Sequence, residues 1–144
     1  MQHPQNITYP NAGSFPVSLT VANENGETNT ITKEDYITVN ATFLMSNQTV
    51  TICNGIFYDS GGDTGNYSNN EDYLMTFKPE TAGANIIVQF IYFDVEYNST
   101  CNWDWLKIYN GINTSASLIG TYCGTNSPGT IEASNDQGAL TFQF

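Results

Sequence analysis

Apolar and polar residues alternate early in the chain, and this pattern predicts a β-hairpin. Residues 17–21 read Val-Ser-Leu-Thr-Val, and residues 28–33 resume a β-branched run. Between them lies Asn-Glu-Asn-Gly at 23–26, a composition typical of a tight turn. Residues 37–39 predict one more short strand.

Further short strands are predicted toward the C-terminus, with no helical periodicity between them. Residues 42–52 are polar and predict an irregular linker between two domains. Residues 86–93 form a nearly continuous apolar run, which predicts a strand buried on both faces. The remaining strands are expected at 106–109, 117–122 and 139–144. Short strands separated by turn signals favour an all-β sandwich or jelly roll.

The composition supports folding and argues against two classes of partner. Hydrophobic residues make up 40% of the 144 residues, and the formal net charge is -11 with only three basic side chains. A chain this acidic repels phosphate backbones and anionic lipids, so we expect no nucleic acid partner. No stretch approaches the roughly 20 apolar residues that a membrane span needs, so no membrane insertion is expected. Residues 1–10 show neither the basic nor the apolar region of a signal peptide.

Two carboxylates stand on either side of a cysteine, between two predicted strands. Glu96 follows the apolar run, and Asp104 precedes the strand expected at 106–109. Paired carboxylates with little basic counter-charge repel each other, and a hard divalent cation relieves this repulsion. The pair therefore predicts a calcium site, and two solvated carboxylates at strand ends are the alternative.

Catalysis is not expected from this sequence. Nucleophilic catalysis needs a base beside a serine or cysteine, and His3, the single histidine, lies in a terminal segment. A glycosidase-like use of Glu96 and Asp104 is the remaining enzymatic alternative. Three cysteines permit one intrachain disulfide with one thiol left over, and their spacing does not suggest zinc.

Several motifs in the second part of the chain resemble those of the CUB domain family. They are Glu-x(4)-Cys-x-x-Asp at 96–104, Ile-Tyr-Asn-Gly at 108–111 and Gly-Thr-Tyr-Cys-Gly at 120–124. The loop sequence Asn-Tyr-Ser-Asn-Asn at 66–70 and the closing pattern at 133–144 add to the resemblance. It covers residues 53–144.

The resemblance implies a jelly-roll β-sandwich, one disulfide and a calcium site. The disulfide would join Cys101 to Cys123, and Glu96 and Asp104 would be calcium ligands. Tyr67 would support the site through its hydroxyl group. In calcium-binding members of the family, a further aspartate lies just beyond the strand that corresponds to the one ending here at Phe144. The residues around 73–78 hold no cysteine that could pair with Cys53.

Residues 1–41 resemble the C-terminal part of a polycystic-kidney-disease-type (PKD) domain, an immunoglobulin-like β-sandwich. The similarity rests on Thr-Tyr-Pro-Asn-Ala-Gly at 8–13, Val-Ser-Leu-Thr-Val at 17–21 and Asp-Tyr-Ile-Thr-Val at 35–39. The predicted organisation is a PKD-like part at 1–41, a linker at 42–52 and a CUB-like domain at 53–144. PKD and CUB modules in tandem are similar to accessory regions of large secreted bacterial proteins, including metalloproteases and adhesins.

These features predict a non-catalytic, calcium-dependent interaction or adhesion module of a larger secreted protein. Its partner would be an extracellular protein or a cell-surface glycan. Carbohydrate binding by the accessory module of a secreted hydrolase is one alternative. Trp103 and Trp105 would then stack on sugar rings from the same side of an extended strand, although residues at that period are more often core. A structural spacer beside a metalloprotease domain is the other alternative.

Strand exchange between copies is a further expectation. A CUB-type sandwich normally continues into a last strand after the one that ends here at Phe144. The resemblance therefore predicts an open sheet edge or apolar groove that can pair with another chain.

Overall fold

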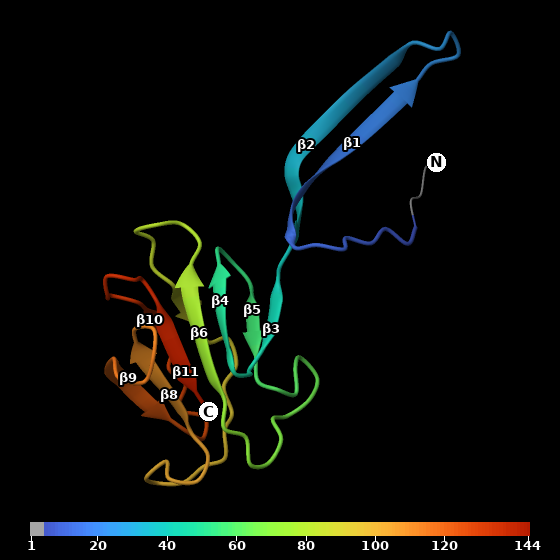
Figure 1. Ribbon diagram of the computed structural model, residues 1–144. Helices are drawn as coiled ribbons and strands as arrows, with labels where there is room; N and C mark the ends of the chain where they lie inside the picture. The colour runs from blue at the N-terminus through green and yellow to red at the C-terminus, as the bar shows by residue number, and fades with distance from the viewer. Residues whose placement is uncertain (1–4) are drawn as a thin grey trace. The chain divides into compact units, whose positions relative to one another are not determined.

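The computed structural model describes residues 5–144, and the described chain consists of strands and connecting loops without helices (Figure 1). His3 lies outside the described residues. The all-β prediction is confirmed. The strands are β1 (Gly13–Ala22), β2 (Thr28–Val39), β3 (Thr42–Leu44), β4 (Gln48–Ile52), β5 (Ile56–Tyr58), β6 (Leu74–Pro79), β7 (Ile87–Gln89), β8 (Leu106–Asn110), β9 (Ser117–Tyr122), β10 (Thr130–Glu132) and β11 (Leu140–Gln143).

The chain divides into two compact units. The first contains residues up to Thr42 together with Asn54–Ile56, and the second contains Phe43–Cys53 together with Phe57–Phe144. The β1–β2 hairpin belongs to the first unit and the sandwich to the second.

The predicted hairpin is confirmed and is longer than expected. β1 and β2 pair antiparallel from Gly13 opposite Val39 to Ala22 opposite Thr28, and the register shifts between Phe15 and Val17, around a proline. Residues 37–39, expected as a separate strand, are the end of β2. Because side chains alternate across a strand, one face carries apolar residues and the other carries hydroxyl groups. The apolar residues are Val17, Leu19, Val21 and Ile31, and the hydroxyl groups pair as Ser18–Thr32 at 2.8 Å and Thr20–Thr30 at 2.7 Å.

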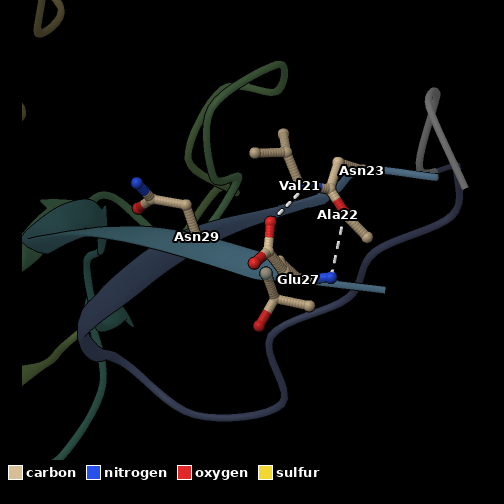
Figure 2. A pocket seen from close by; sticks show the side chains of 6 residues that line it. Val21, Ala22, Asn23, Glu27 and Asn29 are labelled. Atoms are coloured by element: carbon tan, nitrogen blue, oxygen red, sulfur yellow. Dashed lines mark hydrogen bonds between the residues drawn. The ribbon is translucent and has the colours of Figure 1, made fainter. Parts of the chain in front are cut away.

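Asn23 organises the turn that closes the hairpin. Its side-chain oxygen accepts hydrogen bonds from the amides of Asn25 and Glu27, both at 3.0 Å, and its side-chain nitrogen donates to Glu27. Gly26 adopts a φ of 83°, a conformation that favours glycine. Figure 2 shows the shallow pocket at this end of the hairpin, with Asn23 and Glu27 on its wall. Every residue around this pocket is exposed, and none is a candidate site residue.

Residues 42–52 differ from the irregular linker expected there, because they contain β3 and β4. β4 pairs in parallel with β6, with Gln48 opposite Met75 and Ile52 opposite Pro79. Val50 and Ile52 are half-buried against the core, whereas the threonines beside them are exposed. The segment is polar because threonine, a good strand former, fills the outward positions.

The main sheet has five strands in the order β4-β6-β11-β8-β9, and β11 lies at its centre. β11 pairs antiparallel with both β6 and β8. Its residues Leu140, Thr141 and Phe142 are completely buried. The buried hydroxyl of Thr141 donates to the carbonyl of Gly111 at 2.8 Å and lies 2.8 Å from the hydroxyl of Thr76, so no polar group of this side chain is left without a partner. The core around them consists of Met45, Met75, Phe77, Leu106, Ile108 and Ala133.

A second layer covers this sheet with two separate two-stranded ribbons, β3–β5 and β7–β10. The strand predicted at 86–93 is only partly formed, since β7 spans Ile87–Gln89. Its expected burial on both faces is wrong, because Ile91 is 94% exposed and Tyr92 is 82% exposed. The strand lies in an outer layer, so only alternate side chains such as Val88 and Phe90 pack on the core.

Replacing Phe142 tests the packing at the centre of the sandwich. Phe142→Ala should lower the free energy of unfolding by about 3–5 kcal/mol, because it leaves a cavity among aromatic rings. Urea denaturation measures the change. Leu118→Ala on β9 is the matched control, since Leu118 is 52% exposed and should change stability little. Equal losses in the two variants would contradict the packing described here.

Candidate functional site

The hydroxyl group of Tyr67 connects the two carboxylate residues singled out from the sequence. It donates a hydrogen bond to Oδ2 of Asp104 at 3.0 Å and accepts one from the backbone amide of Glu96 at 2.9 Å. The three residues are therefore brought together at one place. They come from two loops, because Tyr67 lies between β5 and β6 whereas Glu96 and Asp104 both lie between β7 and β8.

Local structure explains how each loop reaches this point. Tyr67 lies in the loop between β5 and β6, and its ring packs edge-on against Phe144 with centroids 4.7 Å apart. Glu96 follows Val95, which is buried and forms an isolated bridge to Gly124. Asp104 lies two residues before β8. Each residue is thus adjacent to a point that is fixed by packing or backbone pairing.

A disulfide between Cys101 and Cys123 fixes the loop that contains Glu96 and Asp104. Cys123 is buried and Cys101 is half-buried, and the predicted pairing is confirmed. Cys53 is exposed and carries a free thiol. The disulfide crosses from the Glu96–Asp104 loop to the end of β9, so it limits the separation of these two segments.

The electrostatics of the site act on Tyr67. Burial raises the pKa of its hydroxyl above the ordinary value of 10.0, and the hydrogen bond to Asp104 and the charges of Asp104 and Glu96 raise it further. The amide of Glu96, which donates to the hydroxyl oxygen, lowers the pKa and partly offsets these effects. The neutral hydroxyl is therefore the form that the folded site favours.

Comparison with known proteins decides the family of the second unit. The family model described as CUB domain matches residues 46–144, which is more than half of the chain. The chain belongs to the CUB domain family. The match begins at 46, before the expected boundary at 53, and so includes β4. Residues 5–45 lie outside it, and their PKD-like character stays a prediction.

Several curated proteins are similar to the CUB domain of this chain. Human cubilin is 37% identical over 97 residues, covering 64% of this chain and 3% of cubilin. Human neuropilin-2 is 37% identical over 92 residues, covering 58% of this chain and 10% of neuropilin-2. Exoskeleton protein RP43 of Riftia pachyptila is 36% identical over 84 residues, covering 57% of this chain and 20% of that protein. The chain thus spans a small part of each relative. All three are animal proteins, and the bacterial setting expected from the sequence stays a prediction.

Two carboxylates, Glu96 and Asp104, are the predicted calcium ligands of the CUB domain. Glu96 is exposed and Asp104 is half-buried. Residues 5–144 contain no group of three or more acidic, histidine or cysteine side chains that could hold a metal. Calcium takes 6–8 oxygen ligands and accepts carbonyl groups and water among them. The all-oxygen pair fits such an ion, provided that water and backbone oxygens complete its shell.

Glu71 is a site residue that the sequence reasoning missed. Its Oε1 atom accepts hydrogen bonds from the hydroxyl of Ser60 and from the amide of Ser68 at 2.7 Å. Its Oε2 atom is buried and has no hydrogen-bond partner among the described residues. Ser68 and Glu71 have the Ser-x-x-Glu spacing of a capping box, but that spacing predicts the start of a helix, and no helix follows in the described residues. Glu71 orders the loop that carries Tyr67.

Trp103 and Trp105 do not lie on a strand, contrary to the expectation. Both precede β8 in a loop, where Trp103 is 60% exposed and Trp105 is half-buried. The amino group of Lys107 lies 3.8 Å from the centre of the Trp105 ring. The two tryptophans contribute, with Tyr67, Asp104 and Glu71, to a hollow of about 320 Å³, and Glu96 is not among its lining residues. Trp103 is therefore the more accessible of the two rings.

Removing the disulfide should destabilise the CUB domain. Cys101→Ala/Cys123→Ala should cost about 2–5 kcal/mol in the free energy of unfolding, because an open loop gains entropy in the unfolded state. Cys53→Ser is the matched control and should leave stability unchanged, since this thiol is exposed and free. Urea denaturation of the three proteins measures the difference. An equally stable double variant would show that the disulfide does not fix the loop.

Titration of Tyr67 tests the hydrogen bonds at the site. In calcium-free buffer its pKa should exceed that of an exposed tyrosine, and Asp104→Asn should lower it. A raised folded-state pKa means that the neutral hydroxyl stabilises the fold fully below about pH 10, and that this contribution is lost as the pH rises through the folded pKa. NMR of ring-labelled tyrosine follows the titration. Asp136→Asn serves as the control, and an equal response in the two variants would contradict the assignment.

Proposed function

We propose that this chain is a non-catalytic, calcium-dependent interaction or adhesion module of a larger extracellular protein. The observation that supports it is the Tyr67 hydroxyl, which holds the backbone of Glu96 and the carboxylate of Asp104 at one point. Membership of the CUB family and the disulfide beside the site add support.

Calcium would be held by the side chains of Glu96 and Asp104. The ion would supply positive charge that offsets the two carboxylates, and it would join the two parts of the loop that carry them. Tyr67 has a positioning role, because its hydroxyl donates to Oδ2 of Asp104 and leaves the other carboxylate oxygen available. The acidic surface around the ion would then receive a basic side chain of the partner, commonly lysine. The net charge of -11 favours the approach of such a partner.

The proposed location is outside the cell or at the cell surface. Disulfides persist in oxidising compartments, and this domain contains one. In residues 5–144 no helix is of the length and hydrophobicity that would take it across a bilayer. The partner that fits this location is an extracellular protein.

Carbohydrate binding is the second candidate, and exposed aromatic rings favour it. Tyr97 is 70% exposed and Trp103 is 60% exposed, whereas Tyr109 is buried. Two exposed rings near the carboxylates suit stacking on a cell-surface glycan. This candidate predicts that Trp103→Ala removes glycan binding while calcium binding persists. A glycan array probed with both proteins separates the two functions.

A structural spacer is the third candidate, and the PKD-like assignment of residues 1–41 belongs with it. The hairpin supports that assignment, because one apolar and one hydroxyl-bearing face are typical of a single layer of a β-sandwich. A spacer would bind no calcium. Saturable calcium binding would therefore exclude this candidate.

Calcium titration tests the proposed function. Isothermal calorimetry should detect saturable binding, and Glu96→Gln and Asp104→Asn should each abolish it. Tyr67→Phe should weaken binding about 10–100-fold, as expected for a residue that orients a ligand. Calcium at about 100 times its Kd should raise the free energy of unfolding by about 2.7 kcal/mol.

Asp136→Asn is the matched control for calcium binding, since this exposed carboxylate lies outside the site. It should leave the affinity unchanged. Absence of binding by the parent chain would reject the calcium-dependent function and favour the spacer. Binding that survives in both ligand variants would place the ion elsewhere.

A further inference from the structure

The loop that carries Tyr67 has no strand or helix of its own. It spans residues 59–73, between β5 and β6. The disulfide between Cys101 and Cys123 ties other segments together and does not hold this loop. The position of the Tyr67 hydroxyl therefore depends on contacts within the loop and on the packing of its ring against Phe144.

The chain crosses itself immediately before Tyr67. A methyl group added at Gly61 would overlap the backbone carbonyl of Asn66, and one added at Gly65 would lie 2.6 Å from the carbonyl oxygen of Gly61. Such a close approach of two backbone segments requires glycine, which has no Cβ atom. The two arms of the loop are therefore in contact at the residue that precedes Tyr67.

Glu71 joins the same two arms on the other side of Tyr67. Its Oε1 atom accepts a hydrogen bond from the hydroxyl of Ser60, the neighbour of Gly61, and one from the amide of Ser68 at 2.7 Å. Ser68 directly follows Tyr67. Hydrogen bonds to an ionised carboxylate are roughly twice as strong as those between neutral groups. Tyr67 is thus held before its position by the glycine crossing and after it by Glu71.

Glu71 is not placed to be a ligand together with the two predicted ones. Within residues 5–144, no three acidic, histidine or cysteine side chains are grouped so that they could hold a metal, so Glu71, Glu96 and Asp104 do not form such a set. Any influence of Glu71 on an ion at Glu96 and Asp104 must therefore pass through the loop and the hydroxyl of Tyr67.

We propose that Glu71 is a positioning residue of the candidate calcium site, an inference that rests on the proposed function. By holding Ser60 and Ser68, its carboxylate keeps the Tyr67 hydroxyl within hydrogen-bond distance of two groups at once. These are the amide of Glu96, at 2.9 Å, and Oδ2 of Asp104, at 3.0 Å. The calcium affinity of the site then depends on a side chain that does not touch the ion. The property that matters is the acceptor oxygen of Glu71 rather than its charge.

Hydrogen exchange by NMR in calcium-free buffer tests the positioning directly. The Glu96 amide donates to the Tyr67 hydroxyl, so Glu71→Ala should make it exchange about tenfold faster through local opening. The amides of the central strand β11 should keep their protection. Glu71→Gln keeps an acceptor oxygen and should keep the Glu96 amide protected. Asp63→Ala is the matched control, since it removes an exposed carboxylate from the same loop and should leave this amide unchanged.

Calcium affinity supplies the second readout. Glu71→Ala should weaken calcium binding about tenfold, the lower end of the range for residues that orient a ligand. The same substitution in a Tyr67→Phe background should cause no further loss, because the hydroxyl through which Glu71 acts is then absent. A merely structural role of Glu71 would weaken binding equally in both backgrounds, and that result would overturn the proposal.

The exchange experiment also has outcomes that reject the proposal. Unchanged exchange of the Glu96 amide in Glu71→Ala would do so, and so would equal acceleration in Glu71→Ala and Glu71→Gln, which would indicate an effect of charge. If Glu71→Ala does not fold, Ser60→Ala decides, because it removes one of the two donors and should accelerate the Glu96 amide while β11 stays protected. Absence of calcium binding by the parent chain would reject the proposed function alone, since the exchange is measured without calcium.

Discussion

The arrangement of the candidate site depends on one hydroxyl group. Tyr67 is the point at which the loop before β6 meets the loop that carries both Glu96 and Asp104. Without this hydroxyl, an acceptor on Asp104 and a donor on Glu96 would each need another partner. Water can be that partner, because Glu96 is exposed and Asp104 is half-buried, so each hydrogen bond contributes about 0.5–1.5 kcal/mol net. The same interaction therefore fixes the loops and orients a carboxylate.

The rest of the domain supports this point through the central strand of the main sheet. Phe144, which follows β11, packs against the ring of Tyr67. Two residues earlier, Phe142 is completely buried among the aromatic rings of both layers. The core thus positions the site through β11, and the disulfide positions it through the end of β9. Both supports converge on loops that are otherwise exposed to water.

The sequence predicted those parts of the structure that depend on family motifs or on the alternation of apolar and polar residues along a strand. The Glu-x(4)-Cys-x-x-Asp motif indicated the CUB family, and the alternation at 17–21 indicated the hairpin. The strands within residues 42–52 were not predicted. The exposed threonines make this segment polar overall, although Val50 and Ile52 are half-buried. The burial predicted for both faces of residues 86–93 was wrong, because the exposed residues of this run, such as Ile91, are as hydrophobic as its more buried ones. The role of Glu71 required knowing that Ser60 and Ser68 fold onto its carboxylate.

Terbium luminescence tests the central claim most directly, because it reports both a bound ion and its distance from aromatic rings. Terbium is a hard cation that prefers oxygen ligands and can replace calcium, and its emission is sensitised by nearby tryptophan or tyrosine. Excitation of the protein should produce terbium emission that calcium displaces, since Tyr67, Trp103 and Trp105 lie beside Asp104. The emission should be lost in Asp104→Asn and retained in Asp136→Asn. Emission of equal strength in these two variants, or none in the parent chain, would contradict a calcium site organised by Tyr67.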